Sequence, residues 1–162
     1  MTRMTFKQRL FAKIKIDPTD PHACWVWVGA TTWDGYGRVS RDGRLIYAHR
    51  ATYELYVGSI PPGMFLDHLC HTRNCVRPDH LRIVTHKQNH ENRAGANKNN
   101  RSGVRGVTWH KRSGRWEVQV KHNGRHRFGG YFDDLDAAAD AARALRNQLF
   151  THNTGDRAEA SE

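Results

Sequence analysis

Apolar residues occur along the chain in short stretches separated by polar turns, a pattern that predicts short strands and few helices. Near the N-terminus, Phe6, Leu10 and Ile14 recur every fourth residue, as they would on one face of a helix. The next apolar stretches predict strands at residues 24–28, 38–40 and 45–48, and then a helix over 49–56. The dipeptide Asp42-Gly43 is typical of a hairpin turn between the second and third of these strands.

The middle of the chain predicts a strand, a loop, a second strand and a helix. The apolar run before Asp67 and His68 is expected to form a strand that ends on these two residues. A second strand is expected over Leu81–Val84. Thr85 is a favourable helix N-cap, which would place Asn89 in the first turn of the helix that follows. The helix would point Asn89 back toward the end of the first strand.

The chain changes character after Arg93. The stretch that follows is polar, carries Gly and Asn, and has no apolar period, which indicates a flexible linker. Beyond the linker, strands are expected at residues 104–109, 115–120 and 125–132. Asp134 is a candidate cap for a helix that runs to Leu149.

These elements predict an α+β protein with two modules. The first module is expected at residues 1–95 and the linker at 96–102. The second, a three-stranded antiparallel sheet packed on one helix, is expected at 103–153. A disordered tail is expected at 154–162, where the acidic residues are Asp156, Glu159 and Glu162.

The composition narrows the class of partner. The 162 residues carry a formal net charge of +10 and a pI of about 10.0, which favours a polyanion, with nucleic acid first. A mean hydropathy of −0.80 and 38% hydrophobic residues leave a modest core, which a metal could staple. The sequence contains no run of about 18 apolar residues, which a transmembrane helix would need. The basic N-terminus lacks the apolar region of a signal peptide. We therefore expect a cytoplasmic protein with no membrane partner and no small-molecule substrate.

Cysteine and histidine gather in one short segment. Cys70, Cys75 and His80 follow one another with four residues between successive members, and a closed tetrahedral zinc site needs four such ligands. Cys24 is the only other cysteine, so a site with three cysteines and one histidine would leave no thiol over. In the cytosol such a set is more typical of a metal site than of disulfides. The alternative is that these residues are ordinary core residues.

Asp67, His68 and Asn89 indicate a different chemistry. A neutral imidazole can take a proton from water near pH 7, so His68 is a candidate general base. Carboxylate and amide oxygens suit a hard divalent cation such as magnesium or manganese, so Asp67 and Asn89 are its candidate ligands. Cysteine sulfur suits zinc instead. The segment thus predicts two metal sites with different roles and phosphodiester hydrolysis as the reaction.

The motif D-H-L-C-H-T-R-N-C-V-R-P-D-H-L, followed by V-T-H-K-Q-N, resembles the HNH endonucleases of phages. It is also similar to the His-Cys box homing endonucleases, which share the ββα-metal motif. The resemblance implies that His68 is the general base and that Asp67 and Asn89 hold the catalytic cation. It also implies a structural zinc held by Cys24, Cys70, Cys75 and His80.

Two roles remain open for several residues of this module. His80 also falls at the position of the middle residue of the HNH triad, which orients the base, although the nearby cysteines favour zinc. Asn74 is the alternative for the orienting role. Arg50 and Arg93 are candidate phosphate contacts, and each is equally well explained as a surface or packing residue.

The second module is basic on its predicted sheet. Residues 101–130 hold eight Arg or Lys against one acid, Glu117. The sequence S-G-V-R-G-V-T-W-H-K-R-S-G-R-W-E-V-Q-V, with N-G-R-H-R-F-G-G-Y-F-D after it, resembles the plant ethylene-response-factor DNA-binding domain. The resemblance implies a sheet that enters the major groove of duplex DNA. The implied contacts are Arg105, Trp109, Lys111, Arg112, Arg115, Arg125 and Arg127.

These features predict a DNA endonuclease that cuts duplex DNA by metal-assisted hydrolysis. The resemblance implies a free-standing, homing-type phage nuclease that would act in the cytoplasm of the bacterial host. One alternative is a non-catalytic, sequence-specific DNA-binding regulator that keeps the zinc scaffold, but the complete set of Asp67, His68 and Asn89 favours a nuclease. The other is an RNA-binding protein, which the inward-facing Trp116 disfavours. Monomer and homodimer both stay open.

Overall fold

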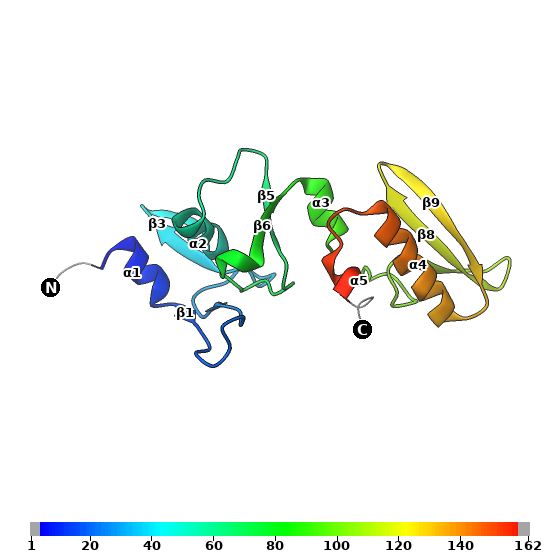
Figure 1. Cartoon of the computed structure of the whole chain (residues 1–162), viewed down its shortest axis with the longest axis horizontal. Helices are drawn as coiled ribbons and strands as arrows, with labels where there is room; N and C mark the ends of the chain where they lie inside the picture. The colour runs from blue at the N-terminus through cyan, green and yellow to red at the C-terminus, as the bar shows by residue number, and fades with distance from the viewer. Residues whose placement is uncertain (1–3, 159–162) are drawn as a thin grey trace. The chain divides into compact units, whose positions relative to one another are not determined.

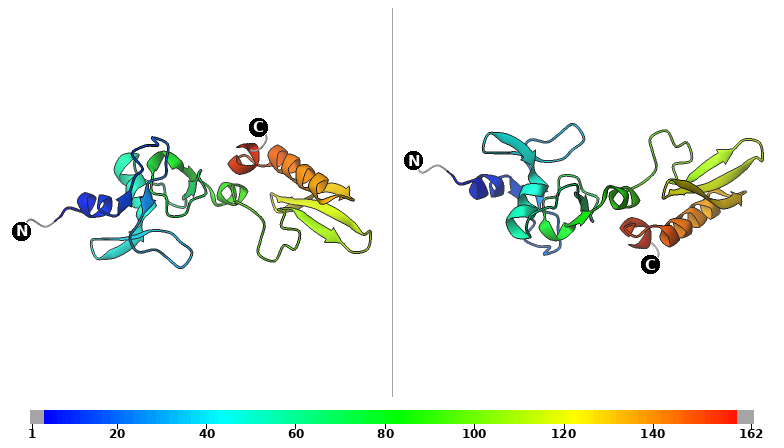
Figure 2. Two further views of the ribbon diagram at one scale, coloured as in Figure 1. Left: turned by 90° about the horizontal axis from the view of Figure 1, so that it is seen from below. Right: turned by 90° about the horizontal axis from the view of Figure 1, so that it is seen from above.

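A computed structural model describes residues 4–158, and the contacts divide the chain into two units (Figures 1 and 2). Unit 1 ends at His86 and unit 2 begins at Lys87. The boundary therefore falls inside the helix α3 (His86–Glu91) and lies before the polar stretch 96–102, where the sequence predicts the linker. All of α3 after its first residue belongs to unit 2.

Unit 1 is built from short elements joined by turns (Figure 1). In chain order they are α1 (Phe6–Phe11), β1 (Ile14–Lys15), β2 (Val26–Trp27), β3 (Arg38–Arg41), β4 (Arg44–Tyr47), α2 (Ala48–Tyr56), β5 (Phe65–His68), the 3-10 turn η1 (Pro78–His80) and β6 (Leu81–Val84). The strands pair as three small antiparallel sheets, β1-β2, β3-β4 and β5-β6. The predicted hairpin at Asp42-Gly43 is present as β3-β4, in which Ser40 pairs with Leu45.

The N-terminal helix is shorter than the apolar period predicts. It begins with a reciprocal capping box, in which the side chain of Thr5 accepts a hydrogen bond from the backbone N–H of Gln8. It ends at Phe11, and Ile14, expected on the same helix face, lies in β1 and pairs with Trp27 of β2. Ile14 still packs against the core of unit 1. The apolar period therefore predicts correctly that Ile14 faces the core, but it predicts one helical turn too many.

Trp27 lies in the main core of unit 1, where its indole Nε1 donates a hydrogen bond to the carbonyl of Ala30 at 2.9 Å. The ring packs directly on Gly29 and Gly37, since a Cβ added to Gly37 would come within 2.6 Å of the ring atom Cδ1. Close approach to the indole therefore requires glycine at Gly37. The buried members of this core are Leu10, Trp27, Val39, Ala48, Ala51 and Val76.

The sheet β5-β6 carries two of the candidate site residues. Asp67 and His68 are the last residues of β5, and they pair with Arg82 and Leu81 of β6. Successive strand residues point to opposite faces, so these two side chains leave β5 on opposite sides. A small buried cluster that includes Leu66 supports the sheet.

Unit 2 contains α3 and a three-stranded antiparallel sheet, in the order β7-β8-β9, with a helix across one face (Figure 2). Its further elements are β7 (Val107–His110), β8 (Arg115–His122), β9 (Arg125–Phe132), α4 (Leu135–Leu149) and α5 (Thr154–Ala158). As predicted, the side chain of Asp134 caps α4 by accepting a hydrogen bond from the N–H of Ala137 at 2.8 Å. The longest helix, α4, has 15 residues, and none of the helices described is long and apolar enough to cross a bilayer.

Two segments that were expected to be flexible make specific contacts within unit 2. In the predicted linker, the side-chain amide of Asn100 donates to two backbone carbonyls at 2.8 and 3.2 Å. In the predicted tail, residues 154–158 form α5, and Asp156 pairs with the buried Arg146 of α4 at 2.6 Å. The prediction of disorder from residue 154 is therefore corrected for α5, because this ion pair and further hydrogen bonds hold it. Glu159 and Glu162 lie outside the described residues.

Replacing Gly37 with Ala is expected to lower the stability of unit 1, because the added methyl group would overlap the Trp27 ring. Overpacking of this kind typically costs about 1–3 kcal/mol. Thermal unfolding followed by tryptophan fluorescence should give a lower midpoint than the wild type. Ser59→Ala, at an exposed position of the same unit, should leave the midpoint unchanged. A wild-type midpoint for Gly37→Ala would mean that the indole has room to move.

Candidate functional site

Three cysteines and one histidine of unit 1 converge on one point. The sulfur atoms of Cys24, Cys70 and Cys75 and a ring nitrogen of His80 all lie within 4.8 Å of one another. The Nδ1 atom of His80 is 3.5 Å from the sulfur of Cys24 and 3.6 Å from that of Cys75. All three cysteines are free thiols. The fold thus brings together the four residues that the sequence predicts as zinc ligands.

The spacing of this cluster fits a tetrahedral zinc ion. Bonds of about 2.3 Å to sulfur and about 2.0 Å to nitrogen would place two ligand atoms about 3.5 Å apart. Both sulfur–nitrogen distances in the cluster agree with that value. Three cysteines and one histidine form a closed donor set, which is typical of structural and not of catalytic zinc. The cluster could therefore hold a structural zinc ion.

The three thiols differ in acidity. The pKa of Cys70 is lowered to about 4, first because Cys75 hydrogen-bonds to its sulfur. The same interaction, together with burial, raises the pKa of Cys75, and burial raises the pKa of Cys24. One thiolate therefore forms readily, and the other two need a nearby positive charge to ionise. A metal ion bound among the sulfurs would supply that charge.

A backbone pairing brings the distant Cys24 to the cluster. The backbone N–H of Val76 donates to the carbonyl of Trp25 at 2.8 Å, and Cys75 forms an antiparallel bridge with Val26. The segment that contains Cys75 therefore runs alongside β2. Cys24 lies two residues before β2, so this pairing carries it to the other ligands.

His68 is buried and takes its orientation from the same segment. Its Nε2 atom lies 3.0 Å from the backbone carbonyl oxygen of Cys75. A carbonyl only accepts hydrogen bonds, so Nε2 carries the proton and Nδ1 keeps the lone pair that a base needs. Burial is the main cause that lowers the pKa of His68 below 6.5, which keeps the ring neutral at pH 7. The sequence leaves the orienting role between His80 and Asn74, whereas this hydrogen bond is made by a backbone group.

Aromatic rings surround His68 within unit 1. The rings of His49 and His68 meet edge to face with centroids 4.9 Å apart, and Tyr36 lies 5.8 Å from His68. His49 is buried at the start of α2, and burial, followed by the nearby His68, lowers its pKa to about 3. Two neutral imidazoles are therefore packed together at pH 7. Sequence reasoning assigned no role to His49, and its only signal was a histidine in the short helix ahead of β5.

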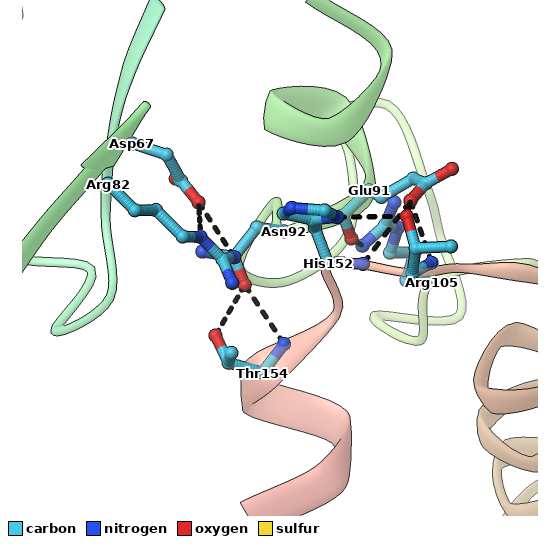
Figure 3. Close-up of polar contacts among 8 residues, drawn as sticks. Asp67, Arg82, Glu91, Asn92, Arg105, His152 and Thr154 are labelled. Atoms are coloured by element: carbon cyan, nitrogen blue, oxygen red, sulfur yellow. Dashed lines mark hydrogen bonds and ion pairs between the residues drawn. The ribbon is translucent and has the colours of Figure 1, made fainter. Parts of the chain in front are cut away.

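Asp67 is buried and held by an arginine (Figure 3). The Nε and Nη2 atoms of Arg82 donate to the same carboxylate oxygen, Oδ2, at 2.9 and 2.8 Å. The two residues face each other across β5 and β6. A buried carboxylate needs a partner of this kind to remain charged without a large desolvation cost.

The remaining candidates of the nuclease motif are not members of the cysteine and histidine cluster. Asn89 is half-buried in α3, and Arg93 is exposed just after this helix, so both belong to unit 2. Arg50 is half-buried in α2 next to His49. The roles assigned to these three residues stay predictions.

Arg105, a predicted DNA contact, makes its contacts with other residues of unit 2 (Figure 3). Its guanidinium donates to the backbone carbonyls of His90, Glu91 and Arg93 at 2.9, 3.1 and 2.8 Å. It also lies over the ring of Phe150, 5.3 Å from the ring centroid. Because its donors are taken by the end of α3, we remove Arg105 from the candidate DNA surface.

The register of the sheet also corrects the predicted basic face. Trp109 pairs with Trp116, which packs against the core beneath α4. Paired residues share a face of the sheet, so Trp109 lies on the α4 side. Arg127 pairs with the buried Val120 and lies on that side too, as does Arg125 two residues before it. The predicted contacts are therefore divided between two faces, because Arg125 and Arg127 pair with His122 and Val120, whereas Arg115 alternates with Trp116 and points to the other side.

The face of the sheet away from α4 carries aromatic and basic side chains. The ring of Tyr131 lies 5.1 Å from the rings of His110 and Phe128, and Phe128 and Tyr131 are 58% and 38% exposed. Arg115 and Lys121 alternate with the buried residues of β8 and so share this face. The ion pair of Arg115 with an aspartate is solvent-exposed and therefore weak. The exposed turn between β7 and β8 adds Lys111 and Arg112.

Comparison with known proteins identifies the middle of the chain. Residues 46–91 match the family model described as HNH endonuclease, which indicates a nuclease domain that acts on DNA. The chain is similar to "Protein 2.8" of Escherichia phage T7, with 34% identity over 88 residues that cover 53% of this chain and 58% of that protein. It is also similar to "Protein 7.7" of the same phage, with 37% identity over 68 residues, or 42% of this chain and 52% of that protein. The chain thus spans little more than half the length of each relative. No solved structure matches it.

The purified protein is expected to contain about one zinc ion per chain, and Cys75→Ser is expected to lose it. Structural zinc contributes folding free energy, so the variant should also unfold at a lower temperature. Elemental mass spectrometry and thermal unfolding measure the two effects. The matched control is His71→Asn, which removes an exposed histidine next to Cys70 and keeps a residue type that tolerates positive φ. Full zinc content in Cys75→Ser would contradict the ligand set.

Proposed function

We propose that the chain is an endonuclease that hydrolyses a phosphodiester bond of duplex DNA, with His68 as the general base. The observation that carries the proposal is the hydrogen bond from buried His68 to the carbonyl of Cys75, which leaves Nδ1 as the basic nitrogen. The HNH match at residues 46–91 supports a nuclease and DNA as its substrate. The cysteine and histidine cluster supports the proposal by offering a rigid anchor for the residue that orients the base.

Hydrolysis of a phosphodiester needs an activated water and a leaving oxygen that ends up protonated. The Nδ1 atom of His68 takes a proton from water, the water oxygen forms a bond to phosphorus, and one P–O ester bond breaks. The leaving oxygen then takes a proton from solvent, and His68 returns its own proton to solvent. A lowered pKa favours this return at neutral pH, so that the base is regenerated.

Asp67 and Asn89 are the proposed ligands of a catalytic divalent cation. Their oxygens are of the type that magnesium and manganese prefer. When bound, such a cation supplies positive charge against the negative charge that develops on the phosphate. Arg82 keeps Asp67 oriented in this proposal, because two of its nitrogens hold the carboxylate.

Binding of duplex DNA is assigned to the basic surfaces of both units. The net charge of +10 supports a polyanionic partner. In unit 2 the proposed contacts lie on the face away from α4 and in the turn between β7 and β8. These contacts are Lys111, Arg112, Arg115 and Lys121, with Arg50 and Arg93 as phosphate contacts of the nuclease motif. The resemblance to the ethylene-response-factor domain also supports Lys111, Arg112 and Arg115. Similarity to two phage proteins supports a phage nuclease that acts in the host cytoplasm.

Loss of the base is expected to abolish cleavage without abolishing DNA binding. Supercoiled plasmid is incubated with the protein and magnesium, and with EDTA as the metal-free comparison. His68→Ala and His68→Gln should lower the cleavage rate by about 10²- to 10⁴-fold, because neither carries a basic nitrogen, while Gln keeps an N–H group that can reach the carbonyl of Cys75. His22→Ala, which removes an exposed histidine of unit 1, should cleave like the wild type.

Zinc content and duplex affinity are measured on the same variants, so that misfolding is recognised. Equal loss of cleavage and binding in a zinc-loaded His68→Gln would remove His68 from the role of base. Duplex binding by a wild type that cleaves no plasmid or genomic DNA would favour the regulator alternative.

The pH dependence of cleavage should reflect the buried position of His68. Protonation of the ring removes the lone pair, so the rate falls as the pH drops through the pKa of His68 in the folded protein. Burial lowers that pKa below 6.5, and the acidic limb of kcat/KM should therefore have its midpoint below 6.5. Zinc content is followed over the same range to exclude loss of the cluster ligands. A midpoint above 6.5 with zinc retained would contradict a buried, neutral base.

A further inference from the structure

We infer that unit 2 sets the position of α3, and with it the position of Asn89, through the positioning residues Arg105, Glu91 and Asn92. Asn89 is the last of the three catalytic candidates and lies in the last helix of the matched HNH region. This inference rests on the proposed function where it assigns a cation to Asn89. The structural part of the inference is that unit 2 holds α3, and it depends only on contacts between residues of unit 2, several of which are drawn in Figure 3.

The helix α3 needs support from outside itself. It has six residues, and isolated helices shorter than about 12 residues are marginal in water. The last carbonyls of any helix have no partner within it. Arg105 supplies donors to three carbonyls at this end, those of His90, Glu91 and Arg93. Its positive charge also lies at the helix end where the backbone dipole is negative.

Glu91, the last residue of α3, is held by the segment that leads into α5. Glu91 is 3% exposed. Its carboxylate oxygen Oε2 accepts hydrogen bonds from the backbone N–H and the hydroxyl of Thr151 at 2.9 and 3.0 Å and from the N–H of His152 at 3.3 Å. The other oxygen pairs with Lys87 one turn earlier at 3.3 Å. Burial raises the pKa of Glu91, but these hydrogen bonds outweigh burial and the net pKa is lowered. The carboxylate is therefore an ionised acceptor at neutral pH.

Asn92 makes a second connection to the same segment. Asn92 is 4% exposed, and its side-chain oxygen Oδ1 accepts hydrogen bonds from the backbone N–H of Thr154 at 3.0 Å and from the Thr154 hydroxyl at 2.6 Å. Thr154 is the first residue of α5. The end of α3 is thus joined to the start of α5 by buried polar contacts.

The residues that hold α3 are themselves fixed to the core of unit 2. Arg146, buried in α4, donates to the backbone carbonyl of Arg105 and pairs with Asp156 of α5 at 2.6 and 2.7 Å. One buried arginine therefore connects α4, α5 and the loop of Arg105. Since the direction of a helical side chain follows from the rotation of its helix, these contacts determine where Asn89 points relative to the sheet of unit 2.

The decisive variant is Arg105→Ala in the full, zinc-loaded chain. Amide hydrogen exchange without DNA or divalent cation should be about tenfold or more faster in residues 88–93, because charged hydrogen bonds at the helix end are lost. Exchange in β8 should be unchanged. The matched control is Arg101→Ala, which removes an exposed arginine from the same loop. The net charge of the protein therefore changes by the same amount in both variants. Manganese titrations followed by electron paramagnetic resonance should show affinity weakened about 10- to 100-fold, as loss of groups that orient metal ligands typically does.

Three outcomes separate this inference from the proposed function. Faster exchange in α3 alone with weakened manganese binding supports it, whereas wild-type exchange in α3 overturns it even if the protein cleaves DNA. A wild type that neither binds manganese nor cleaves overturns the proposed function, and the exchange result still tests the positioning of α3. If Arg105→Ala loosens β8 as well, Glu91→Gln is used, which keeps the side-chain shape and weakens one acceptor. Selective loosening of α3 in that variant supports the inference, and its absence overturns it.

Discussion

The hydrogen bond between Nε2 of His68 and the backbone carbonyl of Cys75 connects two sites with different chemistry. The sulfur of Cys75 lies in the metal cluster, its carbonyl orients the candidate base, and its backbone runs alongside β2. A metal held by this residue would therefore also hold the acceptor of His68. The tautomer of the base depends on that acceptor, so a structural ion would act on proton transfer without touching the substrate. The metal cluster and the candidate base are in this sense not independent.

Strand geometry keeps two adjacent residues of opposite character apart. Asp67 and His68 are neighbours in β5 but leave the strand on opposite faces, where one meets Arg82 and the other meets His49. The charge of Asp67 raises the pKa of His68, yet burial is the larger influence and the net pKa is lowered. On a shared face the carboxylate would lie close to the imidazole and favour its protonated form. The D-H pair can therefore supply a charged group and a neutral base from consecutive positions.

The hairpin and the convergence of cysteine and histidine are predicted correctly because each has a recognisable signal in the residue types. The hairpin at Asp42-Gly43 and the gathering of four Cys and His side chains follow from turn chemistry and from how few residue types bind zinc. The carbonyl of Cys75 could not be found in this way, because every residue has one. The contacts of Arg105 depend on how the chain returns to α3, and the face of Trp109 depends on register. Composition likewise suggested a flexible linker, whereas Asn100 makes hydrogen bonds that composition does not reveal.

The anchoring of α3 has a consequence for how such chains can be recombined. The boundary between the two units runs through the region that matches the HNH family, not along the polar stretch that follows it. A gene fusion joined within residues 94–102 would exchange the part of the chain after the polar stretch and leave the last helix of the HNH-matched region without Arg105. A crossover at the start of α3, with residues 87–162 transferred as one unit, would keep these contacts together. The helix α3, which ends the region matched by the HNH family, would then be transferred together with the rest of unit 2.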